Sequence, residues 1–262
     1  MRGKSWRLSR IFGPDHRAVI LPIDHGLALG DVPGLEDPRA VLWEFLAGPV
    51  DGVLLSIGLD GIVSDLLSGR TAPSRLMTAD TFFDREDGTI AYEVLASPED
   101  AVRWGFDAIK VIMLWDQPAD IRMHMTQEIS RLIKLASTWE IPVMVEPTTR
   151  RAPSSDSMLS DAVRIAVELG ADVLKVPVPQ ESQLLGEWVR RYALPVLVLG
   201  GGTIPSFEAT LTQAELALNM GASGLVMGRA VWHRPRDEGP RLLQRLWSLV
   251  HGGVTPASME KN

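Results

Sequence analysis

The stretch ADVLKVPVP, residues 171–179, is an apolar run typical of a buried β-strand, yet it contains the charged residue Lys175. A lysine is almost never fully buried unless its charge is paired. Either the side chain reaches out of the strand to solvent or to a carboxylate, or the site requires an amine held in a dry place. The rest of the chain shows what kind of fold this strand belongs to.

Seven further runs of the same kind occur along the chain, separated by helix-like segments. Their near-continuous apolar character is typical of parallel strands that are covered on both faces. The eight predicted strands lie at residues 18–24, 52–56, 75–79, 107–114, 141–147, 171–177, 194–201 and 222–228.

The segments between these strands carry apolar residues at helical spacing. Ser97 followed by Pro98 predicts the start of a helix, and Gly170 predicts the end of another. Clear amphipathic stretches lie at residues 38–48, 120–139, 156–170 and 207–221. Strand and helix therefore alternate eight times in 262 residues, which predicts a single (β/α)8 TIM barrel of the α/β class. A doubly wound open sheet is the rival fold, but no GxGxxG motif follows the first strand.

No linker or low-complexity segment divides the chain. We therefore expect one barrel domain over residues 1–262, with residues 1–17 as an N-terminal lead-in and residues 253–262 as a frayed tail. The net charge of -7 argues against a nucleic-acid surface, and the absence of cysteine excludes disulfides, thiolate metal sites and Cys nucleophiles. The sequence has neither a signal peptide nor a run of about 20 apolar residues that could span a membrane, so we expect a cytoplasmic protein.

The polar residues at the C-terminal ends of the predicted strands are the candidate site, because chemistry in a barrel lies at that face. They fall into three groups. The candidate catalytic residues are Asp24, Lys110, Glu146 and Lys175; the candidate anion-binding residues are Gly201, Gly202, Gly228 and Arg229; and the candidate pocket residues are His25, Trp115 and Arg150.

Lys175 has two interpretations. A lysine amine attacks a carbonyl carbon only when it is neutral, and burial together with a nearby cation such as Lys110 favours the neutral form. Lys175 would then form a Schiff base, with Asp24 and Glu146 moving protons or holding the lysines in place. Alternatively, these four side chains form structural ion pairs inside the barrel.

The glycine turns after the seventh and eighth strands also have two interpretations. Backbone N–H groups of glycines can approach an anion closely, and Arg229 adds charge, so together they favour a phosphate site. A single glycine turn is more often a tight connection. His25 follows Asp24 and is expected to point the other way, which favours a structural role. The five scattered histidines show no metal-binding spacing, so no metal is predicted.

Four segments resemble the DeoC/LacD aldolase family, including its archaeal-type class I fructose-bisphosphate aldolases. RIFGPDHRAVILPIDHGLALGDVPGL (10–35) is similar to the opening of that group, with Asp24 in its DHG motif. GADVLKVPVP (170–179) resembles the Schiff-base strand, which implies an imine on Lys175. PVLVLGGGTIP (195–205) and GASGLVMGRAVW (221–232) resemble the two phosphate-binding segments.

One segment departs from the archaeal pattern. The archaeal and transaldolase-like relatives carry an acid/base Tyr in a YPRG segment after the fifth strand, whereas VEPTTRRAP (145–153) has none. Its Glu-Pro, and the Lys in DAIKVIMLW (107–115), are similar to tagatose-bisphosphate and sulfofructose-phosphate aldolases. The resemblance thus groups Lys110, Glu146 and Lys175.

The resemblance implies a cofactor-free, metal-independent class I aldolase that cleaves a phosphorylated ketose or a sulfo-sugar phosphate, and it also implies a homo-oligomer. Two alternatives stay open. One is a transfer enzyme of the same family, like 2-amino-3,7-dideoxy-heptulosonate synthase or the autoinducer-2-phosphate thiolase. The other is a non-catalytic barrel that binds a sugar phosphate. We expect a small-molecule partner, no nucleic acid and no membrane.

Overall fold

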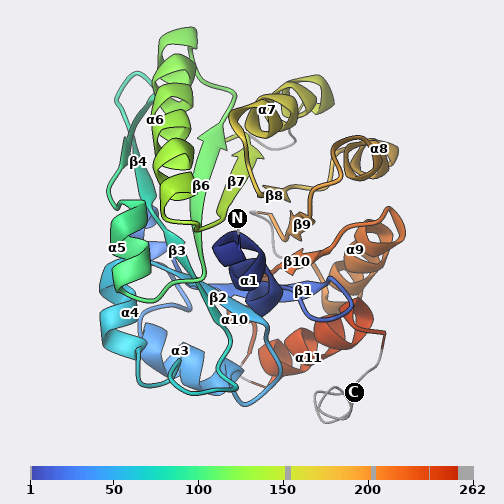
Figure 1. Ribbon diagram of the computed structural model, residues 1–262. Helices are drawn as coiled ribbons and strands as arrows, with labels where there is room; N and C mark the ends of the chain where they lie inside the picture. Colours follow the sequence, from blue (N-terminus) through green and yellow to red (C-terminus); the bar gives the residue numbers. More distant parts are fainter. Residues whose placement is uncertain (1, 151–154, 202–204, 236, 253–262) are drawn as a thin grey trace.

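The computed structural model describes residues 2–150, 155–201, 205–235 and 237–252, and at its centre lies a closed barrel of eight parallel strands (Figure 1). Each of the eight predicted runs contributes one strand, so the (β/α)8 fold is confirmed. Around the barrel the strands are β1 Ala18–Pro22, β2 Gly52–Leu55, β3 Ser74–Thr78, β6 Ala108–Leu114, β7 Val143–Thr148, β8 Val173–Val176, β9 Val196–Leu199 and β10 Gly224–Val226.

Helices surround the barrel (Figure 1). The amphipathic stretches expected at 38–48, 120–139, 156–170 and 207–221 correspond to helices α3, α6, α7 and α9. The helices are α1 Arg2–Ile11, α2 Gly26–Leu29, α3 Pro38–Phe45, α4 Ile57–Val63, α5 Pro98–Arg103, α6 Ala119–Thr138, α7 Asp156–Leu169, α8 Gln183–Tyr192, α9 Phe207–Asn219, α10 Arg229–Trp232 and α11 Glu238–Val250.

The helix ends follow from local chemistry. Ser97 caps α5 by accepting a hydrogen bond from the Asp100 backbone N–H, and the Asp100 side chain accepts one from the Ser97 backbone in return. Pro98 occupies the first helical turn, where its missing N–H costs nothing. Gly170 ends α7 in the left-handed conformation. Both helix ends predicted from the sequence are confirmed.

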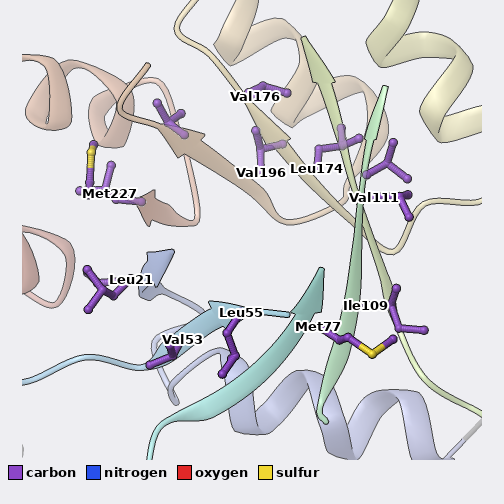
Figure 2. Packing of buried hydrophobic residues seen from close by; sticks show 14 of the residues in the cluster. Leu21, Val53, Leu55, Met77, Ile109, Val111, Leu174, Val176, Val196 and Met227 are labelled. Carbon is purple, nitrogen blue, oxygen red and sulfur yellow. The ribbon is translucent and has the colours of Figure 1, made fainter. Parts of the chain in front are cut away.

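Alternate residues along each strand face opposite sides of the barrel wall, which divides the apolar core into two layers. The outer layer packs between strands and helices, and Figure 2 shows it at alternate positions such as Ile109 and Val111 of β6. The inner layer fills the barrel interior. It consists of Ile11, Phe12, Ala18, Ile20, Leu54, Leu76, Ala108, Met144, Val173, Leu197 and Val226.

The inner layer lies toward the N-terminal ends of the strands. Two residues further along the same strands come Thr78, Lys110, Glu146 and Lys175, so these side chains also face the interior. The apolar inner layer forms the floor of the barrel, and the polar residues lie above it near the C-terminal mouth. The fold therefore brings the predicted strand-end residues to one place.

Helix α1 covers the N-terminal opening of the barrel, in front of the strands in Figure 1. Ile11 and Phe12 at its end join the inner apolar layer. Lys4 Nζ lies 2.7 Å from the Asp172 carboxylate, and Arg10 Nε lies 2.9 Å from Asp107. The segment expected as a simple lead-in thus contains a helix that closes the barrel floor.

An antiparallel hairpin that the sequence analysis did not predict follows β3 directly. It is formed by β4 (Asp80–Asp84) and β5 (Ile90–Val94), and only Ala79 separates it from β3. Its turn has a recognisable signal, because the Asp87 side chain accepts a hydrogen bond from the Thr89 backbone and Gly88 adopts a positive φ. The hairpin extends one barrel strand beyond the mouth.

Among the described residues, no helix has the length and apolar character needed to cross a membrane. The expected C-terminal tail at residues 253–262 lies outside the described residues.

Candidate active site

Lys175 is buried on β8, with 7% of its surface exposed, and its partner is a carboxylate. Its Nζ donates a hydrogen bond to Glu146 Oε2 at 2.9 Å. Glu146 lies on the neighbouring strand β7 and is also buried. The lysine that is unusual in the sequence is therefore held inside the barrel by a charge-assisted hydrogen bond.

Lys110 approaches the same carboxylate from β6. Its Nζ lies 3.4 Å from Glu146 Oε2 and 3.5 Å from Asp24 Oδ2, and Asp24 follows β1. Lys110 lies on the fourth predicted strand and Lys175 on the sixth, and the barrel order β6, β7, β8 places one strand between them. Glu146 lies between the ammonium groups of Lys110 and Lys175, so the site without substrate is an ion-paired cluster.

The protonation states of this cluster follow from its geometry. Burial acts to raise the pKa of Glu146, but Lys175 and Lys110 outweigh it and hold that pKa below its ordinary value. Burial also acts to raise the pKa of Asp24, but Lys110 foremost holds it well below the usual range. Conversely, burial acts to lower the pKa of Lys110, while Glu146 and Asp24 raise it above the ordinary value. Near neutral pH both carboxylates are ionised and Lys110 is charged.

Two polar residues at the end of β3 and the start of β4 were not predicted from the sequence. Thr78 ends β3, and its Oγ1 donates to Asp24 Oδ2 at 2.5 Å. Asp80 follows two residues later, with 3% of its surface exposed. The sequence contains a signal for both residues, since the third apolar run leads directly into Thr78-Ala79-Asp80.

Asp80 binds through one oxygen only. Its Oδ2 accepts the Ile112 backbone N–H at 2.6 Å and the Tyr92 hydroxyl at 3.0 Å, whereas Oδ1 is buried without a hydrogen-bond partner among the described residues. Burial, opposed in part by Lys110, raises the pKa of Asp80 to about 6. A carboxyl group with an unpaired buried oxygen favours its neutral form.

His25 lies beside Asp24 and against the turn after β10. Its Nδ1 is 3.6 Å from Asp24 Oδ1, and its ring packs edge-on to Trp232 at 5.1 Å between centroids. Burial foremost lowers the pKa of His25 to about 4, so the ring is neutral near pH 7. Its Nδ1 is buried without a hydrogen-bond partner among the described residues. His25 therefore lies between the Asp24 carboxylate and Trp232, at the edge of the charged cluster.

Gly228 lies two residues after β10, the eighth barrel strand, and is enclosed by three side chains. A Cβ at this position would lie 2.9 Å from the Pro22 side chain and 3.0 Å from His25 Cε1, so a larger residue would clash. Arg229 follows as the first residue of α10. After β9, Gly201 adopts a φ of +74° that favours glycine. Gly202, the remaining residue of the predicted anion site, lies outside the described residues.

The structure does not bring Trp115 or Arg150 to the charged cluster. Trp115 belongs to the outer apolar layer, where the guanidinium of Arg122 lies 5.2 Å from its ring. Arg150 binds the hairpin through a 2.6 Å ion pair with Asp84. A cavity of about 170 Å³ lies beside Asp24, and its lining includes Leu27 and Ser56.

Comparison with known proteins supports this picture. The model of the DeoC/LacD family aldolases matches residues 18–234. The chain is 31% identical to the 2-amino-3,7-dideoxy-D-threo-hept-6-ulosonate synthase of Halobacterium salinarum, with 97% of this chain and 94% of the relative covered. It is 29% identical to the class 1 fructose-bisphosphate aldolase of Thermoproteus tenax, with 93% of each covered.

A solved structure has the same architecture. It is an archaeal fructose-1,6-bisphosphate aldolase whose catalytic Lys is covalently bound to the carbinolamine intermediate of the substrate. The TM-score is 0.79 at 26% identity, with 95% of this chain and 100% of that chain covered. Because the family match runs from the first residue of β1 to beyond the last barrel strand, the chain belongs to the DeoC/LacD aldolase family.

Proposed function

We propose that this aldolase works through a Schiff base on Lys175 and cleaves a phosphorylated ketose or a close analogue such as a sulfo-sugar phosphate. The observation that carries the proposal is the 2.9 Å hydrogen bond between Lys175 Nζ and Glu146 Oε2, inside a barrel and away from water. An ammonium and a carboxylate at this distance can exchange one proton directly.

That exchange prepares the nucleophile. Glu146 takes a proton from Lys175, which leaves a neutral amine and a neutral acid, while Lys110 and Asp24 remain an ion pair 3.5 Å apart. The net charge of the four groups stays at zero throughout, so little solvation is lost in the buried site. The amine then attacks the ketone carbon, and Glu146 returns its proton to the departing hydroxyl, so that loss of water leaves a protonated imine and an ionised Glu146.

The protonated imine supports cleavage of the carbon–carbon bond. The bonding electrons move toward the imine nitrogen and form an enamine, while the hydroxyl on the departing carbon gives its proton to Glu146 and becomes the aldehyde. Reprotonation of the enamine and hydrolysis then free the second product and the lysine. Glu146 fills the role that a tyrosine has in the archaeal pattern.

The substrate phosphate is proposed to bind at the turns after β9 and β10. Gly201, Gly202, Gly228 and Arg229 supply backbone N–H groups and one guanidinium. His25 lies between Asp24 and Gly228, which supports a contact with the bound substrate between its reacting carbon and its phosphate. Binding of the remote phosphate then orients the reacting carbons.

Borohydride trapping tests the proposal. The protein is incubated with dihydroxyacetone phosphate and sodium borohydride, and the adduct is located by intact mass and peptide mapping. We expect one adduct, on Lys175, that is absent from Lys175→Ala and retained in Lys134→Ala, an exposed lysine on α6. An adduct on Lys110, or full activity of Lys175→Ala, would overturn the assignment.

A transfer reaction is the second candidate. One observation favours it: one of the relatives compared above is named as a synthase. Product analysis with and without an acceptor, either a second aldehyde or coenzyme A, separates the two reactions. Simple cleavage yields the same products in both cases, whereas transfer requires the acceptor.

We also propose a homo-oligomer that acts in the cytoplasm on this phosphorylated metabolite. Large apolar side chains exposed on the helices support self-association, with Trp43 on α3 71% exposed and Ile62 on α4 61% exposed. Light scattering would give the mass in solution, and a monomer at micromolar concentration would contradict the oligomer.

A further inference from the structure

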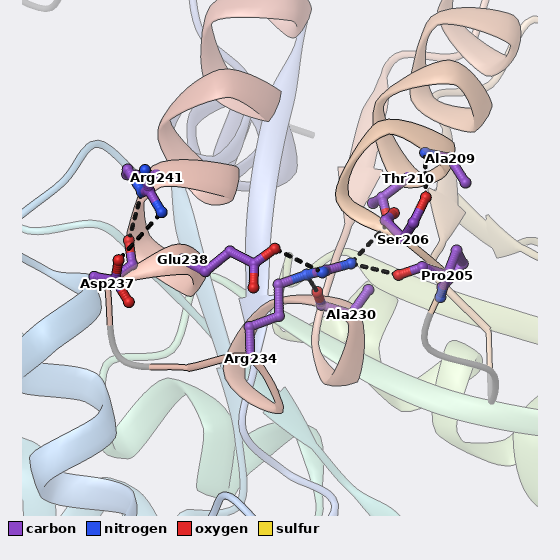
Figure 3. Close-up of polar contacts among 9 residues, drawn as sticks. All are labelled: Pro205, Ser206, Ala209, Thr210, Ala230, Arg234, Asp237, Glu238 and Arg241. Carbon is purple, nitrogen blue, oxygen red and sulfur yellow. Dashed lines mark hydrogen bonds and ion pairs between the residues drawn. The ribbon is translucent and has the colours of Figure 1, made fainter.

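Arg234 lies just past helix α10, and Figure 3 shows its side chain between Glu238 and Pro205. Its side chain is only 7% exposed, and its guanidinium donates hydrogen bonds to several segments at once. Nε donates to the Ala230 carbonyl at 2.7 Å, and Nη2 donates to the Pro205 carbonyl at 2.5 Å. Nη2 also reaches Thr210 Oγ1 at 3.3 Å, and Nη1 lies 3.2 Å from Glu238.

These acceptors belong to the two chain segments that follow the glycine turns. Pro205 comes four residues after Gly201, immediately before the cap of α9, and Thr210 lies in the first turns of that helix. Ala230 is the second residue of α10, adjacent to Arg229 and two residues after Gly228. Arg234 therefore connects the chain behind one proposed anion-binding turn to the chain behind the other.

The hydrogen bonds at position 234 require a guanidinium group. A guanidinium presents several N–H donors in a rigid plane, so one group can bind carbonyls on two segments and fix the distance between them. A lysine ammonium could satisfy one of these carbonyls but could not span both in the same geometry. The 6.0 Å approach of the guanidinium to the Phe207 ring holds the plane in place from the side of α9.

We infer that Arg234 is the positioning residue of the phosphate site, since it holds the Pro205 and Ala230 carbonyls, which lie behind the turns after β9 and β10, at a fixed separation. Arg234 acts through the backbone behind both turns and has no contact with the reacting carbons. Its loss is expected to weaken phosphate binding without slowing the chemistry on Lys175. The inference rests on the proposed function, because it assigns a supporting residue to the same site.

Figure 3 also contains a matched control. Arg241 on α11 pairs with Asp237 four residues earlier, as Arg234 pairs with Glu238 four residues later. The Arg241 pair is exposed, with 67% and 81% of the two side chains accessible. The same substitution at both arginines therefore separates the loss of a positive charge from the loss of the connection between the turns.

The test measures the rate of borohydride trapping against the concentration of dihydroxyacetone phosphate. For Arg234→Met we expect the half-saturating concentration to rise roughly ten- to hundredfold, as is typical for a small misplacement of binding groups, with the rate at saturation unchanged. The inhibition constant of inorganic phosphate should rise in parallel. Arg234→Lys should lie between wild type and Arg234→Met, and Arg241→Met should match wild type.

A purely structural role predicts the opposite split, with a lower saturating rate or melting temperature and an unchanged half-saturating concentration. That result overturns the inference and leaves the proposed function intact. If wild type traps no ketone phosphate, the proposed function itself fails and the inference fails with it. If Arg234→Met does not fold, Arg234→Lys carries the same test, and an unchanged phosphate inhibition constant in that variant overturns the inference.

Discussion

The two ends of the barrel both contain buried charges, but they arrange them differently. At the N-terminal end three aspartates each stand one residue before a strand and accept the backbone N–H of a neighbouring strand, and each also binds one basic side chain. The sets are Asp51 with Val19 N and His251, Asp107 with Arg75 N and Arg10, and Asp172 with Val143 N and Lys4.

At the C-terminal end the charges are shared or unsatisfied. One oxygen of Glu146 faces two ammonium groups, and Asp80 leaves an oxygen without a partner among the described residues. Each aspartate at the N-terminal end thus links two strands to α1 or to the residue after α11. At the C-terminal end the lysines and carboxylates lie within hydrogen-bonding or ion-pair distance of one another, which agrees with the general division of barrels into a stabilising face and a catalytic face.

The largest effect that would sharpen this comparison is expected for Glu146→Gln. The amide still accepts a hydrogen bond from Lys175 but cannot take its proton, so turnover of a ketose phosphate should fall about 10²- to 10⁴-fold. Asp172→Asn at the other end should leave the turnover of folded protein unchanged. Steady-state rates measure the turnover of both variants. An equal loss of turnover in the two variants would contradict the assignment of catalysis to the C-terminal end.

Asp80→Asn is expected to change how stability depends on pH. In wild type the pKa of Asp80 is about 6, against 3.8 for an ordinary aspartate, so the unfolded chain ionises first as pH rises. Wild type should therefore lose about 3 kcal/mol between pH 3.5 and 7.5 that the variant keeps. The amide oxygen still accepts from Ile112 and Tyr92, so the hydrogen bonds are preserved.

Urea denaturation of both proteins at the two pH values measures this difference. Infrared difference spectra at about pH 5 provide a second readout, since most ordinary carboxyl groups are ionised there and wild type should show one additional C=O band of a protonated acid that the variant lacks. If the two proteins keep the same stability difference at both pH values, Asp80 is not the group that holds a proton at this end.

Asp172→Ala should break one set at the N-terminal end. It removes the ion pair with Lys4 and leaves the Val143 N–H without its acceptor, so we expect unfolding to become easier by about 2 kcal/mol. Glu168→Ala is the control, because its pair with Arg164 is exposed and screened by solvent, so its loss should change stability little. Equal midpoints of urea denaturation for the two variants would contradict the role given to these aspartates.

The smallest expected effect concerns His251, whose two ring nitrogens lie 2.6 Å from Asp15 and 3.0 Å from Asp51. Burial acts to lower the pKa of His251, but these carboxylates outweigh it and raise that pKa above the ordinary 6.5. A raised folded-state pKa stabilises the fold below pH 6.5, and this contribution is lost as pH rises. His251→Gln should thus have a lower melting temperature than wild type at pH 6. The difference in melting temperature should be smaller at pH 9.

Parts of the site could be predicted from single strands. Three apolar runs are each interrupted by a charged residue: Lys110, Glu146 and Lys175. A charged residue in an apolar run can be recognised in the sequence without knowledge of its ion-pair partner. Strand parity also indicates which side of the barrel wall a residue faces. Trp115 lies an odd number of residues after Lys110 and so faces the helices, which is why it belongs to the outer layer.

The eight barrel strands and the helices α3, α6, α7 and α9 can be predicted from the sequence, because apolar periodicity and capping are local properties of the chain. Which charges meet depends on the tertiary fold. Closing the barrel places Lys110 and Lys175 on one oxygen of Glu146, joins Lys4 to Asp172 across 168 residues, and leaves Asp80 half satisfied. Burial and register set these pairings, and both depend on the whole fold.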